Sequence, residues 1–521
     1  MIYANAAITA VVWVFATLPF LNFAQLEGYK LKLGKKAVRL YTRYLAAAAV
    51  SAALFFVFLS FYKTQQNTAF LAAAISAALA VKAGVGVWQF LQKRKKPLVY
   101  TPRVIRLIVT QLLAAFLLLV VLLIIGRAIG EHYTYILLVL PFFFTPYLTF
   151  AAVIVNAPFE RLIARRYIKK TAEFFATRGD LIKIGITGSF GKTSVKFILE
   201  KMMLKRYRTV CTPASFNTPM GMARSVALIE PDTEVFIAEM GARYMGNIKE
   251  LCEIVRPGFA ILTAVAGQHL ETMGSIENIY KTKYELVEAL PKSGFCVFNG
   301  DNAYTVKMYN SCRCGKALAS LNRGDCVATD IEVTEHGSSF RLHAGGKSVE
   351  AHTALVGRHN ILNITMAACM AYKLGVSLSD IAKACAELEA VPHRLQVIRL
   401  DNGVTILDDS YNGNREGILM GLETLNMFSG RKIIATPGVV ELGDAEQEVL
   451  TELGAAAAGV VELAFLIGPG AGYLRTGMLG AGFDERNIYM CASLAEAQRH
   501  FEHVLGAGDV VLIANDLPDN Y

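Results

Sequence analysis

A short motif near the middle of the chain, Ile184 to Ser194 with the sequence IGITGSFGKTS, constrains the fold more than any other feature. The apolar run that leads into it, Leu181 to Ile186, is typical of a buried strand, and the glycines allow backbone N–H groups to surround phosphate oxygens. Apolar residues then recur at helical spacing, at Val195, Ile198, Leu199, Met202 and Met203. Strand, glycine loop and helix in this order predict an α/β domain that binds nucleotide phosphates.

The side chains of this loop suit phosphate and magnesium chemistry. Lys192 is placed to reach the terminal phosphates, and the Thr193 hydroxyl to hold Mg²⁺. Ile186 stands where a strict Walker pattern has its first glycine, so a plain glycine turn is the alternative, but Gly-Lys-Thr-Ser between a strand and a helix favours the phosphate loop. The residues predicted to bind the nucleotide here are Thr187, Gly188, Ser189, Gly191, Lys192, Thr193 and Ser194.

Composition divides the chain into two contrasting parts, because residues 1–158 are almost continuously apolar and the rest has a mixed composition. The net charge of +9 comes from Lys and Arg clusters beside apolar segments, which favours membrane topology over a nucleic-acid partner. The nine cysteines include no C-x-x-C pair and indicate neither a disulfide framework nor structural zinc. We predict a transmembrane region at 1–158, a basic juxtamembrane linker at 159–180, a central ATP-binding domain at 181–396 and a C-terminal domain at 397–521.

The N-terminal region predicts about five transmembrane helices, each close to the roughly 20 residues that cross a bilayer. The loops between alternate segments are rich in Lys and Arg, so the positive-inside rule places the N-terminus outside and the remainder of the chain in the cytoplasm. The predicted segments are Tyr3–Ala24, Tyr44–Tyr62, Thr68–Phe90, Val104–Gly130 and Tyr133–Asn156.

A carboxylate follows the next buried strand of the soluble part. Thr233 to Ala238 is apolar and ends at Glu239, and the carboxyl end of a parallel strand lies beside the phosphate crevice. Glu239 is therefore expected to ligate the Mg²⁺ that Thr193 holds, although a helix-capping role is the alternative. Further on, His269 in a loop and Lys283 in a helical stretch could equally be solvent-facing residues.

The order and spacing of several motifs resemble the Mur ligases, and within that family the branch that adds D-alanyl-D-alanine. The resemblance covers about Ile184 to Leu442. Beyond the phosphate loop it rests on Glu239-Met240-Gly241-Ala242, His269-Leu270-Glu271, Lys281-Thr282-Lys283, Asn299-Gly300-Asp301, Gly357-Arg358-His359-Asn360, Pro392-His393-Arg394 and Asp408-Asp409-Ser410-Tyr411-Asn412.

This resemblance implies roles for individual residues. Thr193 and Glu239 would hold one Mg²⁺, and His269 would hold a second together with Lys283, which in the family is carbamoylated by carbon dioxide. The nucleotide would lie among residues before and after the domain junction: Asn299, His359, Asn360, Asn363, Arg394 and Asp409. The expected catalytic set is Lys192, Glu239, His269, Lys283 and Arg394. Further candidates for contact with the substrate are Asn217, Tyr411 and Asn412.

The C-terminal stretch alternates strands and helices from about Val397, which predicts a Rossmann-like, doubly wound α/β domain. His393, Gly413 and Arg415 depart from the family pattern. The larger departure is that the apolar N-terminal region stands in place of the domain that binds the UDP-sugar in the family.

These features favour an ATP-dependent ligase that forms an amide through an acyl phosphate and acts in cell-wall or cell-envelope synthesis. The expected location is the bacterial inner membrane, with the bilayer, an envelope precursor that can be lipid-linked, and an amino acid or dipeptide amine as partners. Two alternatives stay open, a membrane-linked polymerising ligase of the poly-γ-glutamate synthase type and an ATP-binding assembly factor without ligase activity.

Overall fold

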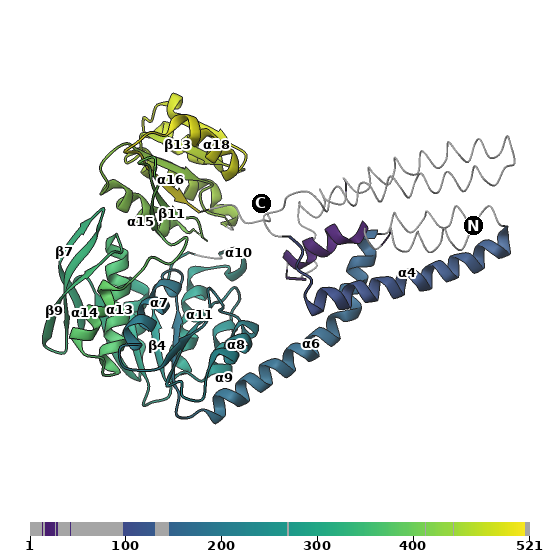
Figure 1. The fold of residues 1–521 in the computed structure, drawn as a ribbon, viewed down its shortest axis with the longest axis horizontal. Coiled ribbons are helices and arrows are strands. Elements are labelled where there is room, and N and C mark those ends of the chain that lie inside the picture. Colours follow the sequence, from purple (N-terminus) through teal and green to yellow (C-terminus); the bar gives the residue numbers. More distant parts are fainter. Residues whose placement is uncertain are drawn as a thin grey trace. The chain divides into compact units, whose positions relative to one another are not determined.

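The computed structural model describes residues 13, 16–26, 28–29, 42, 97–130, 145–267, 270–411, 413–440 and 442–515 (Figure 1). The chain forms two compact units, of which the first comprises residues 1–165 and 518–521 and the second comprises residues 166–517. The second unit contains two separate β-sheets and every described residue of the candidate site.

The sequence predicts a multi-pass protein of the inner membrane with an external N-terminus, and the described part of the chain contradicts that prediction. Within the described ranges, only two helices are long and apolar enough to cross a membrane, Pro102–Ile129 and Tyr147–Thr177. Length and composition alone do not establish a span, so about five crossings are not supported. The predicted segment Tyr44–Tyr62 lies outside the described residues, as do Thr68–Phe90 and large parts of Tyr3–Ala24 and Tyr133–Asn156.

Helix α6, Thr145–Thr177, runs through the segment that the sequence predicts to be a basic linker. Its last turns belong to the second unit, where Phe175 is fully buried and its ring centroid lies 5.0 Å from that of Phe236 on strand β3. The amine of Lys183 caps the helix end by donating to the carbonyls of Phe175 and Arg178, at 2.9 and 3.1 Å.

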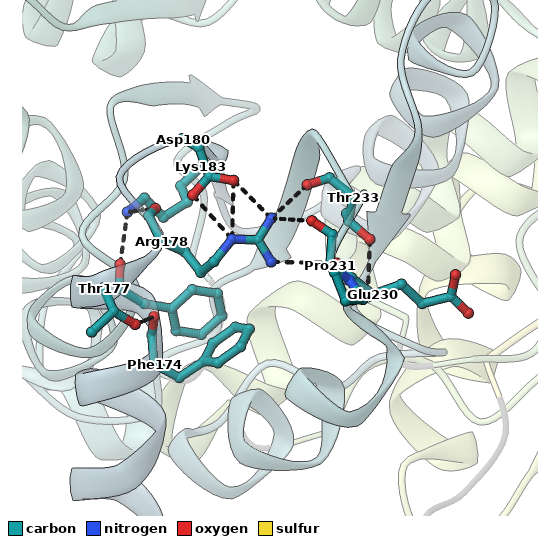
Figure 2. Close-up of polar contacts among 9 residues, drawn as sticks. Phe174, Thr177, Arg178, Asp180, Lys183, Glu230, Pro231 and Thr233 are labelled. Atoms are coloured by element: carbon teal, nitrogen blue, oxygen red, sulfur yellow. Dashed lines mark hydrogen bonds and ion pairs between the residues drawn. The ribbon is translucent and has the colours of Figure 1, made fainter.

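Arg178, directly after α6, ties the helix end to a neighbouring turn (Figure 2). Its Nε donates to both carboxylate oxygens of Asp180 at 3.0 Å. Its two terminal nitrogens donate to the backbone carbonyls of Glu230, Pro231 and Thr233. We call this set of bonds the Arg178 clamp, and it fixes the point at which α6 enters the second unit.

The first sheet of the second unit has nine strands in the order β2-β3-β1-β4-β5-β6-β7-β8-β9. The strands up to the β6–β7 pair run parallel, and β7, β8 and β9 form an antiparallel extension. Their bounds are β1 Ile182–Thr187, β2 Thr209–Cys211, β3 Val235–Glu239, β4 Phe259–Leu262, β5 Phe295–Asn299, β6 Gly315–Ser320, β7 Cys326–Thr334, β8 Gly337–Ala344 and β9 Lys347–Thr353.

Helices cover both faces of this sheet, because two apolar cores form on its opposite sides. One core receives α7 Lys192–Met203, α13 Arg358–Lys373 and α14 Leu378–Ala386. The other core receives α8 Pro219–Ser225, α9 Asn247–Val255, α11 Ile276–Glu288, α12 Ala303–Ser311 and the end of α6. A short helix, α10 Leu270–Met273, precedes α11.

The second sheet has six strands in the order β10-β11-β15-β12-β13-β14, with β10 antiparallel and the others parallel. The strands are β10 Gln396–Arg399, β11 Thr405–Asp409, β12 Lys432–Thr436, β13 Leu463–Ile467, β14 Ile488–Cys491 and β15 Val510–Ala514. The helices are α15 Arg415–Asn426, α16 Glu446–Ala458, α17 Ala471–Gly480 and α18 Leu494–Val504. The predicted α/β class of both soluble domains is confirmed.

Candidate active site

The phosphate loop connects β1 to α7 in the predicted strand-loop-helix arrangement. Gly188 and Gly191 have φ angles of 155° and 78°, and residues with a Cβ atom rarely adopt such values. A Cβ on Gly188 would lie 2.0 Å from Thr263 Oγ1, so the loop also needs glycine there to pack against the end of β4. The Ser189 hydroxyl donates to the carbonyl of Ala266 at 3.0 Å and fixes the loop on its other side.

Lys192 begins α7 and folds back over the loop. Its amine donates to the carbonyls of Gly188 and Ser189, at 2.7 and 3.3 Å. Burial lowers the pKa of Lys192 to about 8, with a smaller contribution from the charge of Arg394, while Glu239 opposes the shift. The cation thus lies where phosphate oxygens would replace the loop carbonyls as its partners.

Glu239 ends β3 beside the loop, because β3 pairs with β1 and brings Glu239 into register with Ile186. The carboxylate is 1% exposed and accepts a hydrogen bond on Oε2 from Thr193 Oγ1 at 3.0 Å. Asn217 donates to its Oε1 at 3.2 Å. Carboxylate and hydroxyl oxygens are the ligands that Mg²⁺ prefers, so Thr193 and Glu239 fit the predicted first metal site.

The predicted second metal site is described only in part. Lys283, on α11, is 4% exposed, and burial lowers its pKa to about 7 with a further contribution from the charge of Lys192. His269 lies outside the described residues. Among the described residues, no group of three or more His, Cys, Asp or Glu is placed to hold a metal ion.

The start of α13 contributes the next group of predicted residues. Burial lowers the pKa of His359 to about 4, so the imidazole is neutral at physiological pH. The Asn360 amide donates to the carbonyl of Val356 at 2.9 Å. The Asn363 side chain lies so close to Gly191 that a Cβ there would be 2.9 Å from Asn363 Oδ1. All three residues line the same cavity as the phosphate loop.

Two other predicted nucleotide residues have structural partners beneath the loop. The Thr187 hydroxyl donates to the carbonyl of Met240 at 2.8 Å. The Asn299 amide donates to the carbonyl of Thr263 at 2.7 Å, and its oxygen accepts from the backbone of Asp301 at 2.8 Å. These two residues, together with Gly188 and Lys283, lie outside the walls of the cavity.

The second sheet completes the cavity. Arg394 donates to the backbone carbonyl of Tyr411 at 2.9 Å and lies 4.5 Å from the centroid of its ring. Burial raises the pKa of Asp409 to about 7, although the charge of Arg394 opposes the shift. The Tyr411 hydroxyl meets the Ser215 hydroxyl at 2.6 Å, which links the two sheets' domains across the cavity. The predicted substrate residue Asn412 lies outside the described residues.

The resulting cavity has a volume of about 270 Å³ and brings together residues from both domains. The predicted residues among its walls are Ser189, Gly191, Lys192, Thr193, Ser194, Asn217, Glu239, His359, Asn360, Asn363, Arg394, Asp409 and Tyr411. Sequence reasoning missed Ser215 and the buried Lys196. The helical spacing was a usable signal for Lys196, which is three residues after Thr193 and therefore on the same side of α7.

Sequence profiles match the two domains that form this cavity. The Mur ligase middle domain matches residues 186–371, and the Mur ligase glutamate ligase domain matches residues 393–515. The UDP-N-acetylmuramoyl-tripeptide–D-alanyl-D-alanine ligase of Escherichia coli is 29% identical over 59% of this chain and 70% of its own length. The enzyme of the same name from Mycobacterium tuberculosis is 36% identical over 47% of this chain and 49% of its own. The chain thus spans about half to seven tenths of these relatives.

Solved structures agree with the sequence relatives. MurF ligase from Thermotoga maritima, solved in complex with ADP, has a TM-score of 0.60 at 26% identity, covering 68% of this chain and 80% of its own. MurF from Acinetobacter baumannii has a TM-score of 0.62 at 22% identity, covering 69% and 78%, and shows the shared fold.

The relatives, named for a UDP-linked precursor, also give no support to the predicted inner-membrane location. The predicted family, in contrast, is confirmed over both catalytic domains. The chain therefore belongs to the Mur ligase family and is MurF-like within it.

Proposed function

We propose that this chain is an ATP-dependent ligase that joins a carboxylate to an amine, with UDP-N-acetylmuramoyl-tripeptide and D-alanyl-D-alanine as its substrates. The curated relatives are named for this pair. The observation that carries the proposal is the meeting of Lys192, Thr193 and Glu239 with Arg394 and Asp409 of the next domain in one cavity. We assign the central domain to 181–396 and the C-terminal domain to 397–521.

Catalysis in this proposal depends on positioning and charge. The backbone of the phosphate loop and Lys192 bind the ATP phosphates, and Arg394 adds a second cation when the domains close. Thr193 and Glu239 would hold Mg²⁺, which supplies further charge neutralisation at the transferring phosphoryl group. The substrate carboxylate takes the γ-phosphoryl group and releases ADP. The amine then attacks the acyl phosphate, and inorganic phosphate leaves as the amide forms.

In this proposal Lys283, carbamoylated, and His269 would hold a second metal ion. The support is the burial of Lys283 and its place in the motif that the family uses for this purpose. Carbamoylation replaces a buried cation by a carbamate, whose oxygens a hard divalent ion accepts. Mass spectrometry of the intact protein at high and low bicarbonate tests for the added carbon dioxide.

The test of the proposed reaction is ADP release together with the mass of the product. We expect ADP release only when ATP, Mg²⁺, the UDP-linked tripeptide and D-alanyl-D-alanine are all present, with a product that gains one dipeptide less one water. A ladder of products would instead indicate a polymerising ligase. ATP binding without any amide product, across a panel of carboxylates and amines, would contradict ligase activity and favour an assembly factor.

A further inference from the structure

Lys196 is a charged residue in the core beside the candidate site, and the proposed mechanism gives it no role. It lies on α7, one helical turn after Thr193, among the buried apolar residues of that helix. Its side chain is 0% exposed. A buried lysine is costly unless its charge is paired, so its partners are informative.

The partners of Lys196 come from two other elements. Its amine lies 3.3 Å from Glu239 Oε2, the same oxygen that accepts the hydrogen bond from Thr193. The amine also donates to the backbone carbonyl of Ala214. The amine further lies over the ring of Phe197, 4.3 Å from its centroid. A single side chain thus joins α7, the end of β3 and the segment at residues 212–218.

Residues 212–218, here called the bridging loop, contact both domains. Ala214 has a φ of 43°, which is unfavourable for a residue with a side chain and needs support from its surroundings. The next residue, Ser215, meets the Tyr411 hydroxyl of the second domain at 2.6 Å. Asn217 donates to Glu239 Oε1 and accepts from the Gly241 backbone at 3.1 Å. Displacement of the Ala214 carbonyl would therefore disturb Glu239 and the contact with Tyr411 together.

Lys196 also differs from Lys192 in where it points. Lys192 lines the cavity, whereas Lys196 is outside its walls and approaches Glu239 from the core side. With Thr193 of the same helix and Asn217 of the bridging loop, it surrounds the carboxylate with three donors from two segments of the chain. Such an arrangement fixes a carboxylate in one orientation.

We propose that Lys196 is a positioning residue, which orients the Glu239 carboxylate for Mg²⁺ and holds the bridging loop so that metal binding and contact with the second domain occur together. This inference rests on the proposed function, because it assigns Glu239 to the metal. Two other roles make different predictions. A cation that merely competed with Mg²⁺ would weaken metal binding, and an ion pair that only stabilised the fold would leave metal binding unchanged.

The test compares Lys196→Met, Lys196→Arg and the control Lys201→Met, which replaces an exposed lysine of the same helix. ADP binding to the full chain is measured by calorimetry across a range of Mg²⁺ concentrations, and ADP release is measured in parallel. We expect Lys196→Met to raise the half-saturating Mg²⁺ concentration roughly tenfold or more, as loss of a supporting contact to a metal ligand does. Lys201→Met should match the wild type.

Lys196→Arg keeps the charge and the donors, so it should recover most of the Mg²⁺ affinity. Lys196→Gln, which is polar but uncharged, takes the place of the methionine variant if that variant does not fold. An unchanged half-saturating Mg²⁺ concentration in a folded Lys196→Met or Lys196→Gln protein with a lowered unfolding temperature would show a purely structural ion pair. A lower half-saturating concentration would show competition with the metal. Failure of the wild-type protein to bind ADP with Mg²⁺ would instead contradict the proposed function.

Discussion

The Lys192 amine donates hydrogen bonds to the carbonyls of its own loop, so we expect its replacement to affect catalysis far more than folding. We expect Lys192→Met to lose at least roughly a hundredfold of ATP turnover, because a cation that neutralises a transferring phosphoryl group is removed. The unfolding temperature should stay within a few degrees of the wild type. Burial of the Lys192 amine, which lowers its pKa, costs free energy and offsets what its hydrogen bonds contribute to stability. Turnover and thermal unfolding measured on one preparation check both expectations. Turnover near the wild-type rate would exclude this loop as the site of ATP use.

Lys283 makes stability depend on pH in a direction that can be worked out. Its amine is neutral in the folded protein above a pKa of about 7, whereas in the unfolded chain it keeps its proton up to 10.5. Between these values the unfolded state binds more protons, so the free energy of unfolding rises with pH. Relative to Lys283→Met, the wild type should gain about 2 kcal/mol between about pH 7 and about pH 9.

Urea unfolding of the wild type and Lys283→Met, in bicarbonate-free buffer with a chelator, measures this difference without carbamoylation or metal. Other titrating groups occur in both proteins and cancel in the comparison. Parallel stability curves would show that the amine of Lys283 keeps an ordinary pKa in the folded protein.

Residues with a local signature were predictable from the sequence, and residues defined by a contact were not. Lys192 and Glu239 follow from a glycine loop and from a carboxylate at the end of a strand. For Lys196 the sequence offers only the helical spacing after Thr193, and that signal is weak because a lysine in an amphipathic helix is usually solvent-exposed. The register of β3 against β1 places the Glu239 carboxylate beside α7, and this contact supplies the partner of the buried Lys196 amine.

At the scale of elements, the junction of α6 with the second unit depends on the Arg178 clamp. Arg178→Met removes a charged donor from several backbone carbonyls that its partly buried guanidinium satisfies. We expect a loss of about 1–3 kcal/mol in the free energy of unfolding of the second unit. Chemical denaturation, followed by a probe within that unit, measures the change.

The matched control for Arg178 is Lys170→Met, which removes a positive charge from an exposed position of α6. Its stability should stay within about 0.5 kcal/mol of the wild type. Arg178→Lys should be intermediate, since an ammonium cannot reproduce the forked donors of a guanidinium. Equal stability of Arg178→Met and Lys170→Met would contradict the clamp.

Regular alternation made most elements of the soluble part predictable. The alternation of strands and helices predicted from about Val397 is observed in the second sheet, and the helix after the phosphate loop buries all of its predicted apolar residues. The antiparallel extension β7–β9 was missed because its half-exposed strands carry no continuous apolar run. The helical continuation of α6 was missed because its exposed basic residues resemble a loop when burial is unknown.

At the scale of the whole second unit, the cavity depends on contacts that join its two domains. Besides the pair formed by Ser215 and Tyr411, Arg399 donates to the carbonyl of Glu335 at 2.6 Å. The Ser429 hydroxyl donates to the Glu335 carboxylate at 3.2 Å, at the turn between β7 and β8. These polar contacts are the kind that can form and break when domains open and close, unlike a large apolar interface.

The end of α6 belongs to this unit as well, and that gives a prediction about where the catalytic part begins. A fragment of residues 166–517 keeps Phe175 in the core and keeps the Arg178 clamp. A fragment that starts at residue 180 loses both, and burial of a phenylalanine alone contributes about 3 kcal/mol or more. We expect the longer fragment to fold, to bind ADP with Mg²⁺ and to release ADP with the UDP-linked tripeptide and D-alanyl-D-alanine. The shorter fragment should unfold at a clearly lower temperature. Equal unfolding temperatures of the two fragments would mean that α6 is not part of the catalytic unit. If the longer fragment folds but shows no turnover while the full chain is active, residues before 166 take part in the reaction.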